Sequence, residues 1–344
     1  MKTLTISKPD DFHLHLRDGA AMASIVNYSA AQFSRAIVMP NLKPAITTVD
    51  MALSYRERIL SSVDEKYNFE PLMTLYLTDN MLPDVINIAA QTESIKALKY
   101  YPAGATTNSD CGVTDIKKIY SVLEAMMKNE LPLLIHGEVS DIEVNVFDRE
   151  KVFIEKVLEP LVDDFCELKI VFEHITTKAA VDFVLNASSN VAATITPQHI
   201  LLNRNDLFNE SFRPHNYCFP VLKEEDDRLA VLGAATSGNS KFFLGTDSAP
   251  HSRSKKESGC GCAGIFSAYN ALELYVEIFD NQNKLDEVEA FTSFFGADFY
   301  GLNRNHEKIT LVKKETHIPE ALPFGDDKLV PLRAGDTCSW QVKF

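Results

Sequence analysis

The feature that most constrains this fold is the alternation of eight short β-rich runs with longer helical patterns along the chain. The β-rich runs cover residues 12–16, 35–39, 72–77, 95–101, 133–137, 169–174, 191–196 and 241–245, and the clearest helical patterns cover 51–62, 114–128, 147–161 and 178–186. Strands separated by helix-sized connections indicate parallel βαβ units, because parallel strands need a long crossover. Eight such units predict a closed (β/α)8 TIM barrel of the α/β class.

An open, doubly wound sheet is the competing fold for the same alternation. It is disfavoured because no Gly-rich phosphate loop follows the first predicted strand. After Gly301 the pattern changes to two short β-rich runs, 308–313 and 337–343, separated by loops that contain Pro and Gly. We therefore expect a barrel over residues 1–304 and a C-terminal extension over 305–344 that packs on the barrel and is not an independent domain.

Charge and composition narrow the class of partner. The formal net charge is −14, whereas proteins that bind a nucleic-acid backbone carry basic patches, so we expect a small-molecule substrate and no nucleic acid. The N-terminal segment lacks a signal-peptide pattern and no apolar run approaches the ~18 residues of a membrane span, so we expect a cytoplasmic protein without membrane contact. The six cysteines are irregularly spaced, and the pair Cys260 and Cys262 has no second pair, so neither disulfides nor a zinc-finger site is expected.

Ligand-type side chains lie at the C-terminal ends of the predicted strands, which is where the active sites of such barrels are found. In the first run, His13 and His15 are two residues apart, so on a strand their side chains share a face and lie roughly 6–7 Å apart. Four other runs end in such residues: Lys99 in SIKALKYYP, His136 in LPLLIHGE, His174 in KIVFEHIT and Asp247 in KFFLGTD. Any one of them could be a satisfied interior polar residue, but five strands that place ligand-type groups at one rim indicate a metal centre.

The number of these ligands indicates two metal ions. Four imidazoles and a carboxylate exceed the three protein ligands, plus water, that a catalytic zinc usually takes. Two metals need a bridging anion, and the ammonium group of Lys99 is unsuited to that role because it only donates hydrogen bonds and repels cations. Carboxylated by CO2, Lys99 becomes a carbamate whose two oxygens can bridge both metals. The alternative for Lys99 is an exposed or ion-paired lysine at a strand end.

Several segments together resemble the amidohydrolase superfamily, and specifically its dihydroorotase branch of the short, single-function bacterial type. The segments are PDDFHLHLRDG, RAIVMPNLKP, KYYPAGATTNS, LLIHGEV, FEHITTK, ATITPQH, YCFPVLK and FLGTDSAPH followed by KESGCGCAG, and they span residues 9 to 264. The resemblance implies two zinc ions per chain, bridged by carboxylated Lys99 and a hydroxide. The implied ligands are His13, His15, Lys99 and Asp247 for one zinc, and Lys99, His136 and His174 for the other.

The same resemblance implies that a substrate carboxylate is bound at the ends of the first two strands. Arg17 and Asn41 would hold it together with His251, which follows the eighth strand. Arginine suits this role because its planar guanidinium matches a carboxylate with two parallel hydrogen bonds. The alternative for Arg17 is a surface ion pair with Asp18 or Asp10.

The resemblance also implies contacts around the rest of the substrate. The backbone groups of Phe219 and Ala263 would meet the amide edges of a ring. A mobile lid over residues 102–112 would close on the substrate through Thr106 and Thr107. This chain departs from the expected lid sequence at two positions, Gly104 and Cys111.

The reaction implied by the resemblance is the reversible hydrolysis of (S)-dihydroorotate to N-carbamoyl-L-aspartate in de novo pyrimidine (UMP) biosynthesis, catalysed by a homodimer. Asp247 would take the proton of the hydroxide and pass it to the departing ring nitrogen. The nearest rival is another cyclic-amide hydrolase, related to the hydantoinases and allantoinases, whose substrate would make no use of the carboxylate-binding cluster. A second rival is a catalytically dead barrel that acts as a binding partner, which the intact ligand set disfavours.

Overall fold

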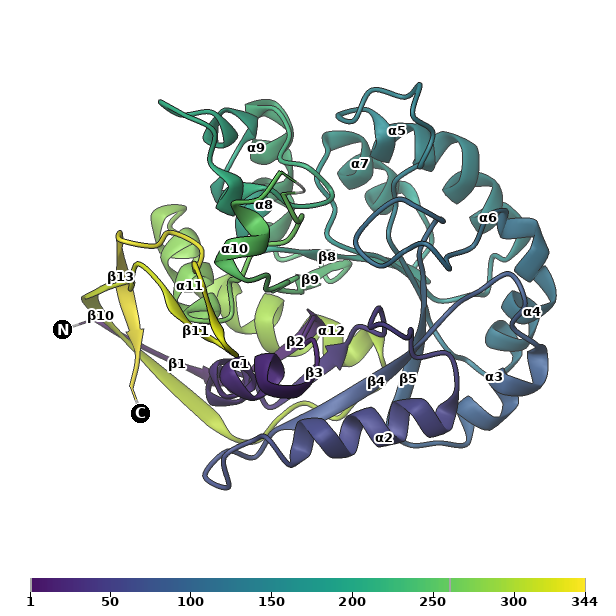
Figure 1. Ribbon diagram of the computed structural model, residues 1–344, viewed down its shortest axis with the longest axis horizontal. Coiled ribbons are helices and arrows are strands. Elements are labelled where there is room, and N and C mark those ends of the chain that lie inside the picture. Colours follow the sequence, from purple (N-terminus) through teal and green to yellow (C-terminus); the bar gives the residue numbers. More distant parts are fainter. Residues whose placement is uncertain (1, 260, 344) are drawn as a thin grey trace.

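Eight parallel strands form a barrel in the computed structural model, which describes residues 2–259 and 261–343 (Figure 1). Each strand pairs with the next one along the chain, in the order β2 to β9, so the predicted (β/α)8 fold is confirmed. The strands are β2 (Asp10–Leu14), β3 (Arg35–Val38), β4 (Glu70–Tyr76), β5 (Ile95–Tyr100), β6 (Leu133–Ile135), β7 (Ile170–Phe172), β8 (Val191–Ile195) and β9 (Phe242–Leu244).

Helices connect the strands and cover the outside of the barrel (Figure 1). The longer ones are α1 (Gly19–Gln32), α2 (Val49–Leu60), α3 (Pro83–Ala90), α4 (Tyr120–Lys128), α7 (Lys178–Asn186), α9 (Glu225–Ala235) and α11 (Ala271–Asn281). The helix predicted over 147–161 is instead divided into α5 (Arg149–Phe153), the π-helix η2 (Ile154–Leu158) and α6 (Glu159–Asp164). Pro160 lacks the amide hydrogen that a continuous α-helix would use, which accounts for the irregular turn before it. Within the described ranges, none of the helices has both the length and the apolar character that crossing a bilayer requires.

The barrel closes between its first and last strands through the segment that follows β9. The backbone amide of Asp247 donates to the carbonyl of His13 at 2.9 Å. Beside this bond, the buried carboxylate of Asp11 accepts hydrogen bonds from the backbone amide of Thr246 at 2.8 Å and from its hydroxyl at 2.6 Å. These bonds fix Asp247 beside His13, so two predicted metal ligands from opposite ends of the barrel sequence lie side by side.

Side chains that point into the barrel change from apolar to polar toward the C-terminal ends of the strands. The apolar interior consists of Phe12, Ile37, Leu72, Ala97, Leu134, Val171, Ala192 and Phe243, with α12 (Phe295–Phe299) packed below it. Two residues further along three of these strands come Lys99, Glu173 and Thr194, all buried. Because side chains on one face of a strand recur every second residue, the apolar interior positions predict which polar groups face the barrel mouth.

A small antiparallel sheet beside the barrel combines the two ends of the chain (Figure 1). Its strands are β1 (Thr3–Ser7), β10 (Lys308–His317) and β13 (Thr337–Val342), and β11 (Leu322–Phe324) and β12 (Asp327–Leu329) form a separate hairpin. β10 is the central strand, and its register pairs Thr3 with Val312 and Val342 with Leu311. The sequence pattern predicted strands near β10 and β13 but not β1. The division between a barrel and an extension at residues 304 and 305 stays a prediction.

Candidate functional site

The strand ends bring most of the predicted site residues to one small cavity at the barrel mouth. Its lining consists of His13, His15, Arg17, Asn41, Tyr101, Thr106, Thr107, His136, His174, Phe219, Asp247, Ala249, Ala263 and Gly264. Two predicted residues lie just outside this lining: the Nζ of Lys99 is 5.2 Å from the ring centroid of Tyr101, and His251 contacts Arg17. Cys260, from the cysteine pair considered above, lies outside the described residues.

A local irregularity in β2 lets two consecutive side chains face the barrel interior. The pairing of β2 with β3 shifts register between Asp11 and Leu14. Such β-bulges re-aim side chains and are frequent next to active sites. Phe12 belongs to the apolar interior, whereas His13 and His15 line the cavity above it. The bulge therefore delivers the His-x-His pair to the mouth without removing Phe12 from the core.

His13, His15 and Asp247 form a buried group whose ligand atoms all lie within 4.8 Å of one another. The Nε2 atoms of His13 and His15 are 3.2 Å apart, and Oδ1 of Asp247 lies 3.5 and 3.2 Å from these two nitrogens. Imidazole nitrogens and a carboxylate oxygen are the ligands that catalytic zinc sites use. The geometry therefore fits a metal ion at the position where the sequence predicted one.

The protonation of these two imidazoles follows from their other ring nitrogens. Nδ1 of His13 lies 2.7 Å from Oε2 of Glu173, and Nδ1 of His15 lies 2.8 Å from Oδ1 of Asn41. Both partners are acceptors, so each Nδ1 carries the proton and each Nε2 presents a lone pair in the neutral ring. Burial lowers the pKa of both imidazoles and favours that neutral form. Two lone pairs and the carboxylate oxygen of Asp247 thus face one another, an arrangement that a cation between them would stabilise.

A second pair of imidazoles lies next to the first group. Nδ1 of His136 is 3.3 Å from Nε2 of His174, and Nε2 of His136 lies 3.0 Å from a carboxylate oxygen of Glu138. Because Glu138 is an acceptor, the lone pair of His136 is on Nδ1 and points toward His174. The rings of His174 and His13 are 4.9 Å apart between centroids. His136 and His174 therefore fit a second metal ion adjacent to the first.

Lys99 lies on β5 with its side chain fully buried. Its Nζ makes no hydrogen bond to any described residue, and no described carboxylate lies within ion-pair distance. Burial lowers the pKa of Lys99 to about 8. The neutral amine, which is the nucleophilic form, is therefore more populated near neutral pH than for an exposed lysine. Lys99 is neither exposed nor ion-paired here, in contrast to the alternative considered from the sequence.

Three residues at the site have backbone angles that non-glycine residues rarely adopt. The φ angles of Arg17, His174 and Asp247 are 61°, 44° and 42°, in the left-handed region. Each residue follows a barrel strand directly or within a few positions. Backbone strain of this kind persists where the surroundings over-determine it and is concentrated at functional sites.

A cationic group without a carboxylate partner lies beside the imidazoles. Nη2 of Arg17 is 3.1 Å from Nε2 of His251. Burial first, and then Arg17, lowers the pKa of His251 to about 2, so its neutral ring accepts the hydrogen bond. In the described part of the chain no carboxylate lies within ion-pair distance of Arg17, and Asp18 and Asp10 pair with other arginines. A partly buried guanidinium in this state favours an anionic ligand.

The segment 102–112 lies closed over the cavity. The side-chain amide of Asn41 donates to the carbonyl of Thr107 at 3.1 Å, and the hydroxyl of Thr107 donates to the carbonyl of Ala263 at 3.3 Å. Asn108 donates to the carbonyl of Asn41 at 2.9 Å. The cavity beneath measures about 20 Å³, which holds about one water molecule. A ring-shaped substrate therefore requires this segment to move.

Sequence reasoning missed Glu173, which orients a predicted ligand. Its Oε2 accepts hydrogen bonds from Nδ1 of His13 and from the hydroxyl of Thr194, the latter at 2.6 Å. Burial alone would raise the pKa of Glu173, but His13 holds it below its ordinary value, so the carboxylate is ionised. Carboxylates in this position fix the tautomer of a metal-binding histidine. The available signal was the inward alternation of the strand, in which Glu173 is two residues beyond Val171.

From the sequence, His199 fits a loop-orienting role and a core or capping role equally well, and in the structure it fixes the segment that carries Phe219. Its Nε2 donates to the carbonyl of Pro220 at 2.9 Å, and its Nδ1 lies 2.7 Å from the hydroxyl of Thr196. The ring is buried, with a pKa lowered to about 4 by burial. His199 therefore links the end of β8 to the backbone beside Phe219.

Comparison with known proteins gives the family of the chain. No family model matches it. The dihydroorotase of Microcystis aeruginosa is 61% identical over 342 residues, which cover 99% of each chain. The crystal structure of dihydroorotase from Saccharomyces cerevisiae, in complex with 5-fluoroorotic acid, is 35% identical, has a TM-score of 0.92, and aligns over 100% of this chain and 99% of its own. The crystal structure of dihydroorotase from Campylobacter jejuni is 36% identical, has a TM-score of 0.92, and aligns over 100% of this chain and 98% of its own. The chain therefore belongs to the dihydroorotase family, hydrolases that act on a cyclic amide.

Proposed function

We propose that this chain catalyses the reversible hydrolysis of (S)-dihydroorotate to N-carbamoyl-L-aspartate, a step of pyrimidine biosynthesis, with two zinc ions at the barrel mouth. The observation that carries the proposal is the group of converging lone pairs around Asp247, next to the guanidinium of Arg17, which has no carboxylate partner among the described residues. The first arrangement favours a cation and the second an anion. A metal-dependent hydrolase whose cyclic-amide substrate bears a carboxylate needs both. The complex of the yeast relative with 5-fluoroorotic acid supports this substrate class.

The residues present fit the implied metals. The proposed ligands are His13, His15, Lys99 and Asp247 for one zinc, and Lys99, His136 and His174 for the other. Lys99 would act as a carbamate, in which its neutral amine forms a bond to the carbon of CO2 and a proton leaves to solvent. The buried, unpartnered Nζ supports this modification, because a carbamate would turn a group with only donors into two acceptor oxygens. When bound, the two zinc ions would polarise the ring carbonyl and lower the pKa of water.

Asp247 would move the proton. Burial raises its pKa, so its carboxylate accepts a proton more readily than an exposed aspartate does. It would accept a proton from the water that attacks the ring carbonyl carbon and deliver it to the ring nitrogen as the C–N bond breaks. Ring closure runs the same transfer in reverse and starts from the protonated carboxyl. Hydrolysis should therefore accelerate with rising pH and ring closure with falling pH, with an apparent pKa that belongs to the whole coupled assembly.

The carboxylate of the substrate would be held by Arg17, Asn41 and His251. In the closed structure the side chain of Asn41 bonds to His15 and Thr107, so its contact with substrate would require the lid to open and close again. The backbone of Phe219 and of Ala263 would contact the ring, with Thr106 and Thr107 closing over it. Both backbone positions line the cavity, which supports this assignment.

The test is turnover of (S)-dihydroorotate by zinc-loaded protein, followed through the absorbance of the ring in both directions. Asp247→Asn should keep zinc and lose most turnover, because an amide neither accepts nor donates the proton at accessible pH. A near-wild-type rate in either direction with zinc retained would reduce Asp247 to a ligand. Hydrolysis of neutral cyclic amides without turnover of dihydroorotate would favour a hydantoinase-like activity instead. A cytoplasmic location and a homodimer stay predictions.

A further inference from the structure

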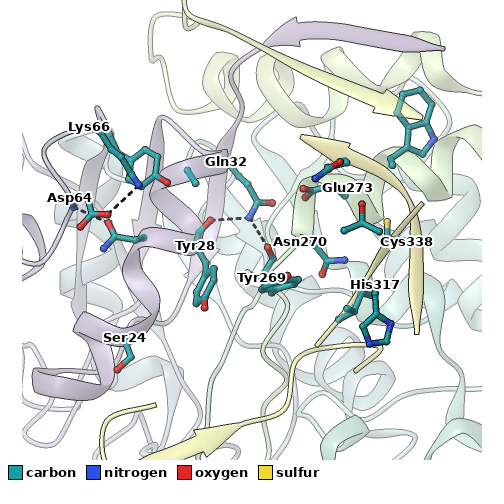
Figure 2. Close-up of a pocket in the computed structure, with 17 residues that line it drawn as sticks. Ser24, Tyr28, Gln32, Asp64, Lys66, Tyr269, Asn270, Glu273, His317 and Cys338 are labelled. Carbon is teal, nitrogen blue, oxygen red and sulfur yellow. Dashed lines mark hydrogen bonds and ion pairs between the residues drawn. The ribbon is translucent and has the colours of Figure 1, made fainter. Parts of the chain in front are cut away.

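A second cavity lies away from the barrel mouth, between α1, α11 and the strands β10 and β13 (Figure 2). Its volume is about 470 Å³, which is within the range of small-molecule sites. None of the residues that line the barrel-mouth cavity lines this one. Its walls include the rings of Tyr28 and Tyr269, with centroids 5.6 Å apart and planes inclined at 58°. The fold gives this cavity no evident role in holding the barrel together.

Asn270 is turned into this cavity instead of capping a helix. It occupies the N-cap position of α11, where asparagine is among the preferred residues, yet its side chain makes no capping bond. Gln32 takes over that role, because its Oε1 accepts from the backbone amide of Leu272 at 2.9 Å. The side chain of Asn270 is 6% exposed, and neither its Oδ1 nor its Nδ2 has a hydrogen-bond partner. A buried amide left unpaired in this way points to a ligand.

Glu273, within the first turn of α11, adds an unpaired carboxylate oxygen (Figure 2). It is 9% exposed, and its Oε1 accepts from the backbone amide of Val342 at 3.2 Å. Its Oε2 has no partner, and no cation among the described residues lies within ion-pair distance of it. The hydroxyl of Thr316 on β10 is likewise buried and unpaired. Glu273 and Asn270 together therefore present more acceptors than donors.

The charges around the cavity favour a cation. Lys66 is the one lysine or arginine among the described residues of the lining. It lies 3.6 Å from a carboxylate oxygen of Asp64 and 4.7 Å from the ring centroid of Tyr67, so its charge already has a partner. Aromatic faces such as those of Tyr28 and Tyr269 attract cations. The net charge of −14 raises the local concentration of cations over the whole surface.

We propose that this cavity binds a small organic cation with at least two N–H donors, of the guanidinium or primary ammonium class. The cation would donate to Oε2 of Glu273 and Oδ1 of Asn270 and lie against the tyrosine rings. The site is independent of the proposed reaction at the barrel mouth. Water alone, or a side chain from a second copy of the chain, are the competing occupants.

The experiment is calorimetric titration of the full chain at about pH 8.5, where Glu273 is ionised, with methylguanidinium and with the neutral, similarly shaped N-methylurea. Methylguanidinium should bind saturably below roughly 10 mM, and N-methylurea at least tenfold more weakly. Glu273→Gln should weaken methylguanidinium binding at least tenfold. The glutamine oxygen can still accept from Val342, so this variant should fold. Glu93→Gln, which removes the same charge at an exposed position, should leave binding unchanged.

A second variant guards against a folding defect in the first. Asn270 makes no hydrogen bond through its side chain, so Asn270→Ala removes no hydrogen bond of the fold and should still weaken methylguanidinium binding several-fold. The proposal is overturned if no saturable binding occurs, if both variants bind as tightly as the wild type, or if N-methylurea binds equally well. It is also overturned if a crystal grown with methylguanidinium holds only water in the cavity or the side chains of a second copy.

Discussion

The barrel mouth and the cavity beside α11 both contain buried polar atoms without partners, but the two cavities differ in volume. At the mouth, the Nε2 atoms of His13 and His15 are 3.2 Å apart in a cavity of about 20 Å³, so their lone pairs already point at one another. Beside α11, the unpaired atoms of Asn270 and Glu273 border about 470 Å³. Lone pairs that converge in a cavity with room for one water suit a bare metal ion, whereas acceptors that border a larger cavity suit a molecule that brings its own donors. The free volume beside the unpaired atoms thus indicates the kind of ligand.

The strongest way to break this comparison is Lys99→Ala. The change removes a proposed metal ligand and not merely an outer-shell partner, so turnover should fall by more than about 100-fold and at least one zinc should be lost. Binding of methylguanidinium at the second cavity should stay the same. Turnover, zinc analysis and calorimetry on one preparation measure all three. Lys96→Ala, on the same strand but half-exposed, is the matched control, and an active, zinc-loaded Lys99→Ala protein would refute the carbamate bridge.

The next largest effect is expected from Arg17→Met. Loss of the ionic partner of the substrate carboxylate should lower kcat/KM for dihydroorotate by a factor that corresponds to roughly 2–5 kcal/mol of lost binding free energy, while zinc stays bound. Arg58→Met, which removes an exposed guanidinium paired with Asp18, should change little. Unchanged kcat/KM for dihydroorotate in Arg17→Met would show that the mouth does not select for a carboxylate.

Glu273 gives the comparison a pH dependence. Burial raises its pKa from 4.5 to about 7, so burial alone favours the protonated form, whereas a bound cation would favour the ionised carboxylate that accepts its N–H groups. The associated stability is present below pH 4.5 and is lost as pH rises through about 7, with an upper limit of roughly 3 kcal/mol. Charged or titratable groups in the cavity lining besides Glu273 include Asp64, Lys66 and His317. Urea titrations between these pH values should show a smaller fall in unfolding free energy for Glu273→Gln than for the wild type. Glu93→Gln should show the same fall as the wild type. An equal dependence of unfolding free energy on pH in all three proteins would contradict the raised pKa of Glu273.

The smallest expected effect concerns the lid. Thr107→Val keeps the shape of the side chain and removes the hydroxyl that donates to Ala263. A single hydrogen bond of this kind contributes about 1 kcal/mol, so kcat/KM should fall about fivefold. Steady-state kinetics measure the change, and Thr92→Val, at a hydroxyl that bonds only to its own helix, is the control. Identical kinetics in Thr107→Val would mean that the lid closes without this contact.

The barrel and the candidate ligands could be predicted from the sequence because both follow from periodicity. The alternation of inward residues places Lys99 two positions beyond Ala97, and strand ends bring His136 and Asp247 to one rim. Glu173 was missed because its partner His13 is 160 residues away and no local pattern links them. The hydrogen bond from the backbone amide of Leu272 to Gln32 is equally unpredictable from the local sequence, because the two residues are 240 positions apart.

The edge strand β1 was also missed, although residues 3–7 (TLTIS) alternate strictly between polar and apolar. Its partner could not be predicted locally, because the pairing is with β10, about 300 residues later. A strand whose ladder forms at such separation shows few signs of its partner in its own sequence. The short apolar runs of the barrel were recognisable because their neighbours in space are also neighbours along the chain.

The small sheet also brings the first and last described strands of the chain, β1 and β13, onto the same central strand. Thr3 pairs with Val312 on one side of β10, and Val342 pairs with the adjacent Leu311 on the other side. Thr3 and Val342 are therefore two strand spacings apart, about 10 Å. A linker of about five residues could therefore join residue 343 to residue 2, and a new break in the exposed segment 208–213 would yield a circular permutant with every strand pairing intact. The order in which the eight barrel units are synthesised would then change while their order around the barrel would not.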